Sequence, residues 1–93
     1  MPTVLHHPER RKFELPTEAG TAWIDYEIQG DTMILHHSEV PDSLRGQGIG
    51  SLLVTQTMDQ IAREGKYRVR PTCGYIRSIV RSEGKWNDLL ASA

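Results

Sequence analysis

The spacing of apolar residues changes once along the chain, at Pro41, and this change limits the fold more than any other feature. Before Pro41, apolar and polar residues alternate in short runs, as half-buried strands require. After it, the spacing becomes that of one face of an amphipathic helix, which comprises Gly50, Leu53, Val54, Thr57, Met58 and Ile61. The sequence therefore predicts an antiparallel meander followed by a helical part, which is an α+β fold.

Four strands are expected before Pro41. They are residues 3–5, a run around Phe13 and Leu15 that Pro16 ends, residues 22–28, and residues 32–40. Gly30 lies in the turn between the last two runs, which predicts a hairpin there.

The second half predicts a helix, a strand and a second helix. The first helix ends at Gly65, because glycine commonly follows the last helical residue. Residues 67–70 alternate as a strand that stops at Pro71, and residues 75–80 have helical spacing up to about Gly84. The expected order is β-β-β-β-α-β-α. The helix between residues 32–40 and 67–70 would make these two strands parallel neighbours.

Composition narrows the class of protein. A chain of 93 residues predicts one domain over residues 1–93, and a net charge of −1 argues against a dedicated nucleic-acid binder. No apolar run approaches the ~20 residues of a membrane span. Cys73 is the only cysteine, so an internal disulfide and a cysteine-rich zinc site are excluded. The N-terminus does not have the pattern of a signal peptide, so we expect a cytoplasmic protein. Nothing near His6 and His7 in the sequence completes a metal site, so we expect no metal.

The segment Arg45-Gly46-Gln47-Gly48-Ile49-Gly50 precedes the long helix. Glycines allow close approach of the backbone, and the first turn of a helix offers unpaired N–H groups to phosphate oxygens. A tight turn without a ligand explains the glycines equally well. Two known phosphate motifs fail here, because a P-loop needs lysine after its last glycine and a dinucleotide fingerprint needs glycine where Ser51 stands.

The string from Val40 to Gly50 resembles the coenzyme A pyrophosphate loop of the GNAT N-acetyltransferase superfamily. Arg45, Gly48 and Gly50 fill the places of its pattern. Further matches indicate a minimal GNAT-like subfamily, and they are Phe13-Glu14-Leu15, Gly20, Ala22, Tyr26, His37 and Pro71-Thr72-Cys73. The chain departs from that subfamily at Gly74, where proline is usual, and at Glu83-Gly84-Lys85-Trp86, which replaces a His-Pro pair before an aromatic residue.

The resemblance implies a mixed, splayed sheet in a three-layer-like arrangement. Acetyl-CoA would lie between the strands formed by residues 32–40 and 67–70. Its binding residues would be Val40, Arg45, Gly46, Gln47, Gly48, Ile49, Gly50 and Cys73. An amine, from a small molecule or a protein, would accept the acetyl group, and Tyr75 would protonate the departing thiolate.

Cys73 and His37 are the other candidate catalytic residues. Cys73 either carries the acetyl group as a thioester or is a small buried side chain, and a nearby base or a helix N-terminus would activate it. His37 is preferred as that base because the resemblance matches it, while Glu39 is the alternative base. His36 and His37 are expected on opposite faces of their strand, one toward the core or cleft. His6 and His7 are expected to be exposed.

Three functions stay open at this point. The first is an acetyl-CoA-dependent N-acetyltransferase, the second a non-catalytic module that binds coenzyme A or acyl-CoA, and the third an interaction protein. The arginines at 68, 70, 77 and 81 form either a solvated surface or a basic rim for coenzyme phosphates or an acidic acceptor.

Overall fold

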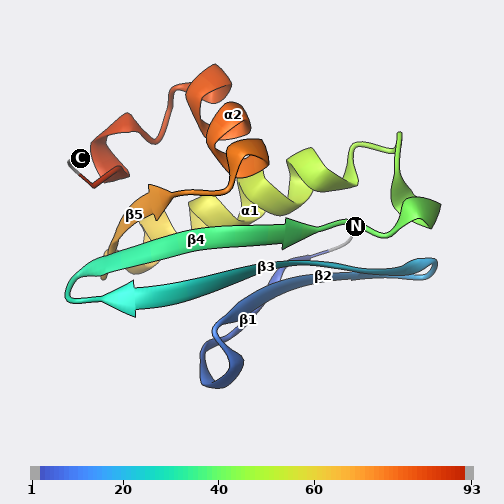
Figure 1. Cartoon of the computed structure of the whole chain (residues 1–93), viewed down its shortest axis with the longest axis horizontal. Helices are drawn as coiled ribbons and strands as arrows, with labels where there is room; N and C mark the ends of the chain where they lie inside the picture. Colours follow the sequence, from blue (N-terminus) through green and yellow to red (C-terminus); the bar gives the residue numbers. More distant parts are fainter. Residues whose placement is uncertain (1–2, 92–93) are drawn as a thin grey trace.

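The computed structural model describes residues 3–91, which form a five-stranded sheet and two α-helices (Figure 1). The strands are β1 (Leu5–His7), β2 (Lys12–Thr17), β3 (Gly20–Gln29), β4 (Thr32–Glu39) and β5 (Arg68–Pro71), and the helices are α1 (Ile49–Glu64) and α2 (Gly74–Glu83). Short 3-10 turns cover Pro8–Arg10, Asp42–Leu44 and Asn87–Leu89. The predicted order β-β-β-β-α-β-α is confirmed.

The strands lie in the sheet in the order of the sequence. Neighbouring strands from β1 to β4 are antiparallel. Strands β4 and β5 are parallel because α1 returns the chain to the end of the sheet at which β4 begins. The sheet is therefore mixed, as expected. Between β3 and β4 the chain reverses in a two-residue turn in which Gly30 has a φ of 61°.

Helix α1 buries the face that its sequence predicts. Its buried residues are Gly50, Leu53, Val54, Thr57, Met58 and Ile61. The helix ends at Gly65, whose φ of 66° lies in the left-handed region that favours glycine. Between residues 3 and 91, no helix is both long enough and apolar enough to cross a membrane.

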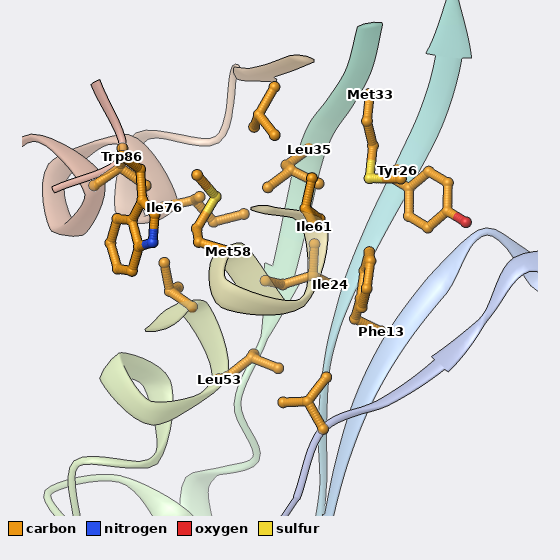
Figure 2. Packing of buried hydrophobic residues seen from close by; sticks show 14 of the residues in the cluster. Phe13, Ile24, Tyr26, Met33, Leu35, Leu53, Met58, Ile61, Ile76 and Trp86 are labelled. Atoms are coloured by element: carbon orange, nitrogen blue, oxygen red, sulfur yellow. The ribbon is translucent and has the colours of Figure 1, made fainter. Parts of the chain in front are cut away.

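The buried side chains of the sheet and of both helices form one cluster (Figure 2). Phe13, Ile24 and Leu35 contribute from the sheet, while Met58 and Ile76 contribute from the helices. On the strands, every buried residue belongs to the face that meets the helices. The predicted α+β class with a mixed sheet is therefore confirmed, and the described chain has two layers instead of the three-layer-like arrangement that the resemblance implies.

The first strand begins two residues later than predicted. Residues 3 and 4 do not belong to it, because α1 holds Val4 instead. The Val4 amide donates to Gln56 Oε1 at 2.7 Å, and the Val4 carbonyl accepts a hydrogen bond from Gln60 Nε2 at 2.6 Å. With its backbone engaged by two glutamines, the buried Val4 joins the core rather than a strand pair.

One proline lies within a strand and another lies at the end of one. Pro16 was expected to end a strand but lies within β2, in the half that pairs only with β3, whereas Pro71 is the last residue of β5, as predicted. Proline is tolerated at both places because a strand with one neighbour leaves alternate amides unused.

The histidine pair near the N-terminus is half-buried rather than exposed. The ring of His6 stacks on Phe13 with centroids 4.1 Å apart, and His6 Nε2 lies 2.6 Å from Tyr26 Oη. His7 Nε2 lies 3.1 Å from Glu14 Oε1. Both histidines therefore attach β1 to the rest of the sheet.

Candidate functional site

Strand β4 continues beyond the end of β5, and the two strands separate there (Figure 1). Their parallel pairing ends at Leu35 and Pro71. The amides of Thr72 and Cys73 both donate to the Leu35 carbonyl, at 3.0 and 3.2 Å, before α2 begins. Residues 36–39 of β4 then pair only with β3, so one edge of this stretch faces no strand. The result is the splayed sheet that the resemblance implies.

A β-bulge interrupts β4 at the point of separation. Tyr26 of β3 lies opposite Leu35, but the preceding residue, Asp25, lies opposite His37. Strand β4 thus has one extra residue at His36. Since side chains alternate between the two faces of a sheet, one extra residue reverses the faces of all residues that follow in the strand.

The bulge turns Ser38, rather than His37, toward the helices. Ser38 lies opposite the buried Ile24, whereas His37 lies opposite Asp25 on the other face. His36 and His37 are both exposed, so the expectation that one of them enters the core or the cleft is wrong. His37 Nε2 instead lies 3.3 Å from Glu39 Oε1.

The thiol of Cys73 contacts Ser38, a residue that the sequence analysis did not select. Cys73 is half-buried at the start of α2, and its Sγ lies 3.4 Å from Ser38 Oγ. Burial raises the pKa of this thiol, but hydrogen bonds from Ser38 and from the amides of Ile76 and Tyr75 outweigh burial and leave the pKa below its ordinary value. The start of α2 was one of the two activating features expected for Cys73. The other, a base on the adjacent strand, is replaced in this position by a hydroxyl.

The glycine loop leads into the N-terminus of α1 in a left-handed conformation. The φ angles of Gly46 and Gly48 are 80° and 74°, values that side chains with a Cβ rarely adopt. The helix begins at Ile49 with Gly48 as its N-cap, and neither a capping side chain nor an acidic residue occupies its first turn. The Leu52 amide donates to the Gly48 carbonyl at 3.0 Å, so the amides of residues 49–51 lack an acceptor within the helix.

A cleft of about 460 Å³ opens beside these amides. The end of β4, the glycine loop, the first turn of α1 and the first turn of α2 surround it. Its lining residues are Ser38, Glu39, Val40, Leu44, Arg45, Gly46, Gly48, Ile49, Gly50, Ser51 and Tyr75. Uncapped amides at the positive end of a helix dipole make this cleft suited to an anionic group.

Two of the predicted binding residues lie outside the lining of the cleft. Gln47 is exposed, and its Nε2 donates to the Ser43 carbonyl at 3.2 Å. Cys73 reaches the cleft through its contact with Ser38. Ser38, Leu44 and Ser51 line the cleft without having been predicted.

Tyr75 of α2 lies directly over Gly50 of α1. A Cβ added to Gly50 would collide with Tyr75 Oη and would lie 2.8 Å from Cζ. Gly50 is buried, whereas Tyr75 is 48% exposed. The absence of a side chain at Gly50 therefore lets the phenol extend over the helix and into the cleft.

Arg45, which lines the cleft, forms an exposed ion pair. Arg45 Nε lies 2.9 Å from Asp42 Oδ1, and both side chains are largely exposed. Such pairs contribute little to stability, so the guanidinium can exchange this partner for another anion. Within residues 3–91, no group of three or more histidine, cysteine, aspartate or glutamate side chains is placed to hold a metal ion. That the protein uses no metal remains a prediction.

Comparisons with known proteins agree on one family. A family model described as GCN5-related N-acetyl-transferase matches residues 12–89. Protein NATD1 of Xenopus tropicalis is 36% identical over 81 residues, which cover 84% of this chain and 73% of that protein. Protein NATD1 of Bos taurus is 35% identical over 81 residues, with 84% and 71% covered.

One solved structure has a similar fold. The solution structure of a GCN5-like putative N-acetyltransferase from Staphylococcus aureus matches with a TM-score of 0.70. The match covers 97% of this chain and 88% of that chain at 22% identity. At this identity, the likeness concerns the arrangement of the strands and helices.

Proposed function

The chain belongs to the GCN5-related N-acetyltransferase family, and on this premise we propose that it transfers the acetyl group of acetyl-CoA to an amine. The observation that carries the proposal is the uncapped N-terminus of α1, which opens into the cleft of about 460 Å³ beside the separated end of β4. A helix start without a side-chain cap and without an acidic residue favours an anionic ligand.

Two features of the cleft fit coenzyme A. The amides of residues 49–51 would bind the oxygens of its pyrophosphate, with the backbone of Gly46 and Gly48 close to them. The edge of residues 36–39, which faces no strand, would exchange hydrogen bonds with the amide groups of the pantetheine arm, as an added strand does. The acetyl end would then lie where β4 and β5 separate, near Cys73 and Tyr75.

The transfer needs two proton movements. The amine nitrogen forms a bond to the acetyl carbon, the bond from that carbon to sulfur breaks, the nitrogen loses a proton and the departing thiolate gains one. Tyr75 lines the cleft and would donate the proton to the thiolate. Glu39 also lines the cleft and lies next to His37, so this pair would accept the proton of the amine.

An acetyl-thioester on Cys73 is the alternative route. The contact with Ser38 and the start of α2 lower the pKa of Cys73, which increases the share of the nucleophilic thiolate. In this route the acetyl group passes first to Cys73 Sγ and then to the amine. Mass spectrometry after incubation with acetyl-CoA distinguishes the routes, because only the second adds one acetyl group to the native protein. A denatured control corrects for non-enzymatic acylation, and Cys73→Ser should remove the adduct.

Binding of coenzyme A to a matched pair of glycine variants tests the proposal. Gly48 and Gly65 have φ angles of 74° and 66°, and a Cβ at either would meet no atom within 4 Å. Both valine variants therefore suffer similar backbone strain, but only Gly48 lines the cleft. By calorimetry we expect Gly48→Val to weaken coenzyme A binding by at least about tenfold, roughly 1.4 kcal/mol, and Gly65→Val to retain it. Equal affinities of the two variants would refute the proposed binding mode.

A panel of amines tests turnover. Release of free thiol from acetyl-CoA in the presence of an amine supports the transferase. Tight binding of coenzyme A without release of thiol for any amine would instead favour a module that only binds acyl-CoA.

A further inference from the structure

The basic residues of the chain are concentrated around β5 and α2. Residues 66–85 contain six of the eleven lysines and arginines but only one of the twelve acidic residues, Glu83. The six are Lys66, Arg68, Arg70, Arg77, Arg81 and Lys85. A chain with a net charge of −1 thus has a strongly positive segment next to its proposed site.

Three of these arginines line one groove of about 300 Å³ between the end of β5 and α2. They are Arg70, Arg77 and Arg81, and Thr72 lines the groove beside Cys73. The groove and the coenzyme cleft lie on different sides of α2. Tyr75 lines the cleft and Arg77 lines the groove, and two residues correspond to a rotation of about 200° around a helix. A ligand in the cleft and a ligand in the groove would therefore approach Cys73 from two directions.

The positions of Arg77 and Arg81 on α2 do not contribute to the stability of the fold. Both are exposed, they stand four residues apart on α2, and like charges at this spacing repel each other. Within residues 3–91, no carboxylate pairs with either of them, whereas Lys12 pairs with Asp25 and Arg45 with Asp42. An anionic ligand would supply the missing partner.

The edge of β5 is closed to an added strand. Ala91 donates its amide to the Val69 carbonyl at 2.8 Å, which occupies the first part of the outer edge. The next outward position is Pro71, which has no amide to donate. A ligand in this groove is therefore held by side chains, and a guanidinium is the side chain that best matches the geometry of carboxylate and phosphate oxygens.

We propose that this groove receives the acceptor amine, and that the acceptor carries an oxyanion, a carboxylate or a phosphate, which Arg77 and Arg81 bind. The inference rests on the proposed acetyl transfer. The coenzyme and the acceptor then lie on opposite sides of α2. The bonds that form and break, and the protons that move, are those described for the transfer above. Because the oxyanion is bound alike before and during the reaction, the two arginines lower the KM for the acceptor and leave kcat nearly unaltered.

The test compares amines that differ only in charge. The α-carboxamides of glutamate, O-phosphoserine and glutamine, of which only the first two carry an oxyanion, are offered with acetyl-CoA, and the release of thiol is followed. We expect kcat/KM for one or both of the anionic amines to exceed that for glutamine amide by about tenfold to a hundredfold, as charged hydrogen bonds allow. In Arg77→Gln/Arg81→Gln this preference should disappear through KM, while the KM for acetyl-CoA is retained. The control Arg10→Gln/Arg63→Gln removes two charges outside the groove and should keep the preference.

A binding experiment separates this inference from the proposed function. A triglutamate peptide is titrated into the wild type and into Arg77→Gln/Arg81→Gln, and the amide shifts of α2 are recorded. Binding that the double variant loses supports the groove even if no amine is acetylated, in which case only the transferase proposal fails. Equal turnover of the α-carboxamides of glutamate, O-phosphoserine and glutamine overturns the inference and leaves the transferase standing. A titration in which α2 does not respond in the wild type also overturns it.

Discussion

Replacing Gly50 with alanine tests the contact that brings α2 over the coenzyme cleft. Gly50 is the second residue of α1 and has no positive φ, so alanine fits its backbone without strain. The added Cβ would, however, collide with Tyr75 Oη and lie 2.8 Å from Cζ. The phenol must therefore leave its place, or the two helices must separate.

The expected effect of Gly50→Ala on the free energy of unfolding has opposite signs in the wild type and in a Tyr75→Ala background. Alanine in place of glycine stabilises a helix by about 0.5–1 kcal/mol, with the lower figure apt so near the helix end. Filling an occupied space costs about 1–3 kcal/mol, and the low end applies because Tyr75 is half exposed and its ring can swing outward. Gly50→Ala should thus leave the wild type unchanged or destabilise it by about 1 kcal/mol. In a Tyr75→Ala background the collision is absent, so the same change should stabilise by about 0.5 kcal/mol.

Urea denaturation of the four proteins in this cycle measures the coupling. We expect a coupling energy of about 1 kcal/mol between the two positions. Calorimetry with coenzyme A should show weaker binding for Gly50→Ala, because the displaced phenol no longer lines the cleft in the same way. An equal effect of Gly50→Ala on stability in both backgrounds would show that Tyr75 does not lie over Gly50.

Three further changes test other parts of the structure. Ser38→Ala removes a hydrogen bond that lowers the pKa of Cys73, so that pKa should rise and alkylation by iodoacetamide near neutral pH should slow; an unchanged rate would contradict the contact. Burial lowers the pKa of His6, so its contribution to stability is complete above about pH 6.5 and is lost as the pH falls, and His6→Gln should flatten this part of the pH dependence of unfolding. Leu53→Ala should cost about 2–5 kcal/mol in urea denaturation, while Leu5→Ala, at a half-exposed position, should cost under about 0.5 kcal/mol; similar losses would argue against the observed packing.

The topology could be predicted because the spacing of apolar residues agrees with the positions of glycine and proline along the chain. The change of spacing at Pro41 separates strands from helix, and Gly65 and Gly84 stand at the ends of the two helices, where left-handed residues are required. The parallel pairing of β4 and β5 follows from a helix that connects them. Each of these predictions depends on local sequence alone.

The bulge could not be predicted in this way. His36 is neither glycine nor proline, and no turn signal marks the point where the register shifts. Simple alternation from Met33 and Leu35 would place residue 37 on the side of the helices, and that rule fails after the extra residue. The register is decided by pairing with β3, which is information from a distant segment. Ser38 was missed for this reason, and His37, the histidine preferred for the core or the cleft, is exposed.

The end of β2 was misjudged for a similar reason. Whether proline ends a strand depends on how many neighbours that strand has at that point, which the sequence of the strand does not state. Pro16 remains within β2 because β1 no longer pairs with that half of the strand.

The bulge also makes the site tolerant of one change in the length of β4. In a structure with a period of two, one additional residue is a shift of half a period, and it persists to the end of the strand. Deleting His36 would place His37 directly after Leu35 and restore regular pairing, so Ser38 would still lie opposite Ile24 and face the thiol of Cys73. A related chain without the bulge therefore needs one residue fewer in this strand to present the same hydroxyl, and comparisons of related chains at this site require an alignment that is correct to a single residue.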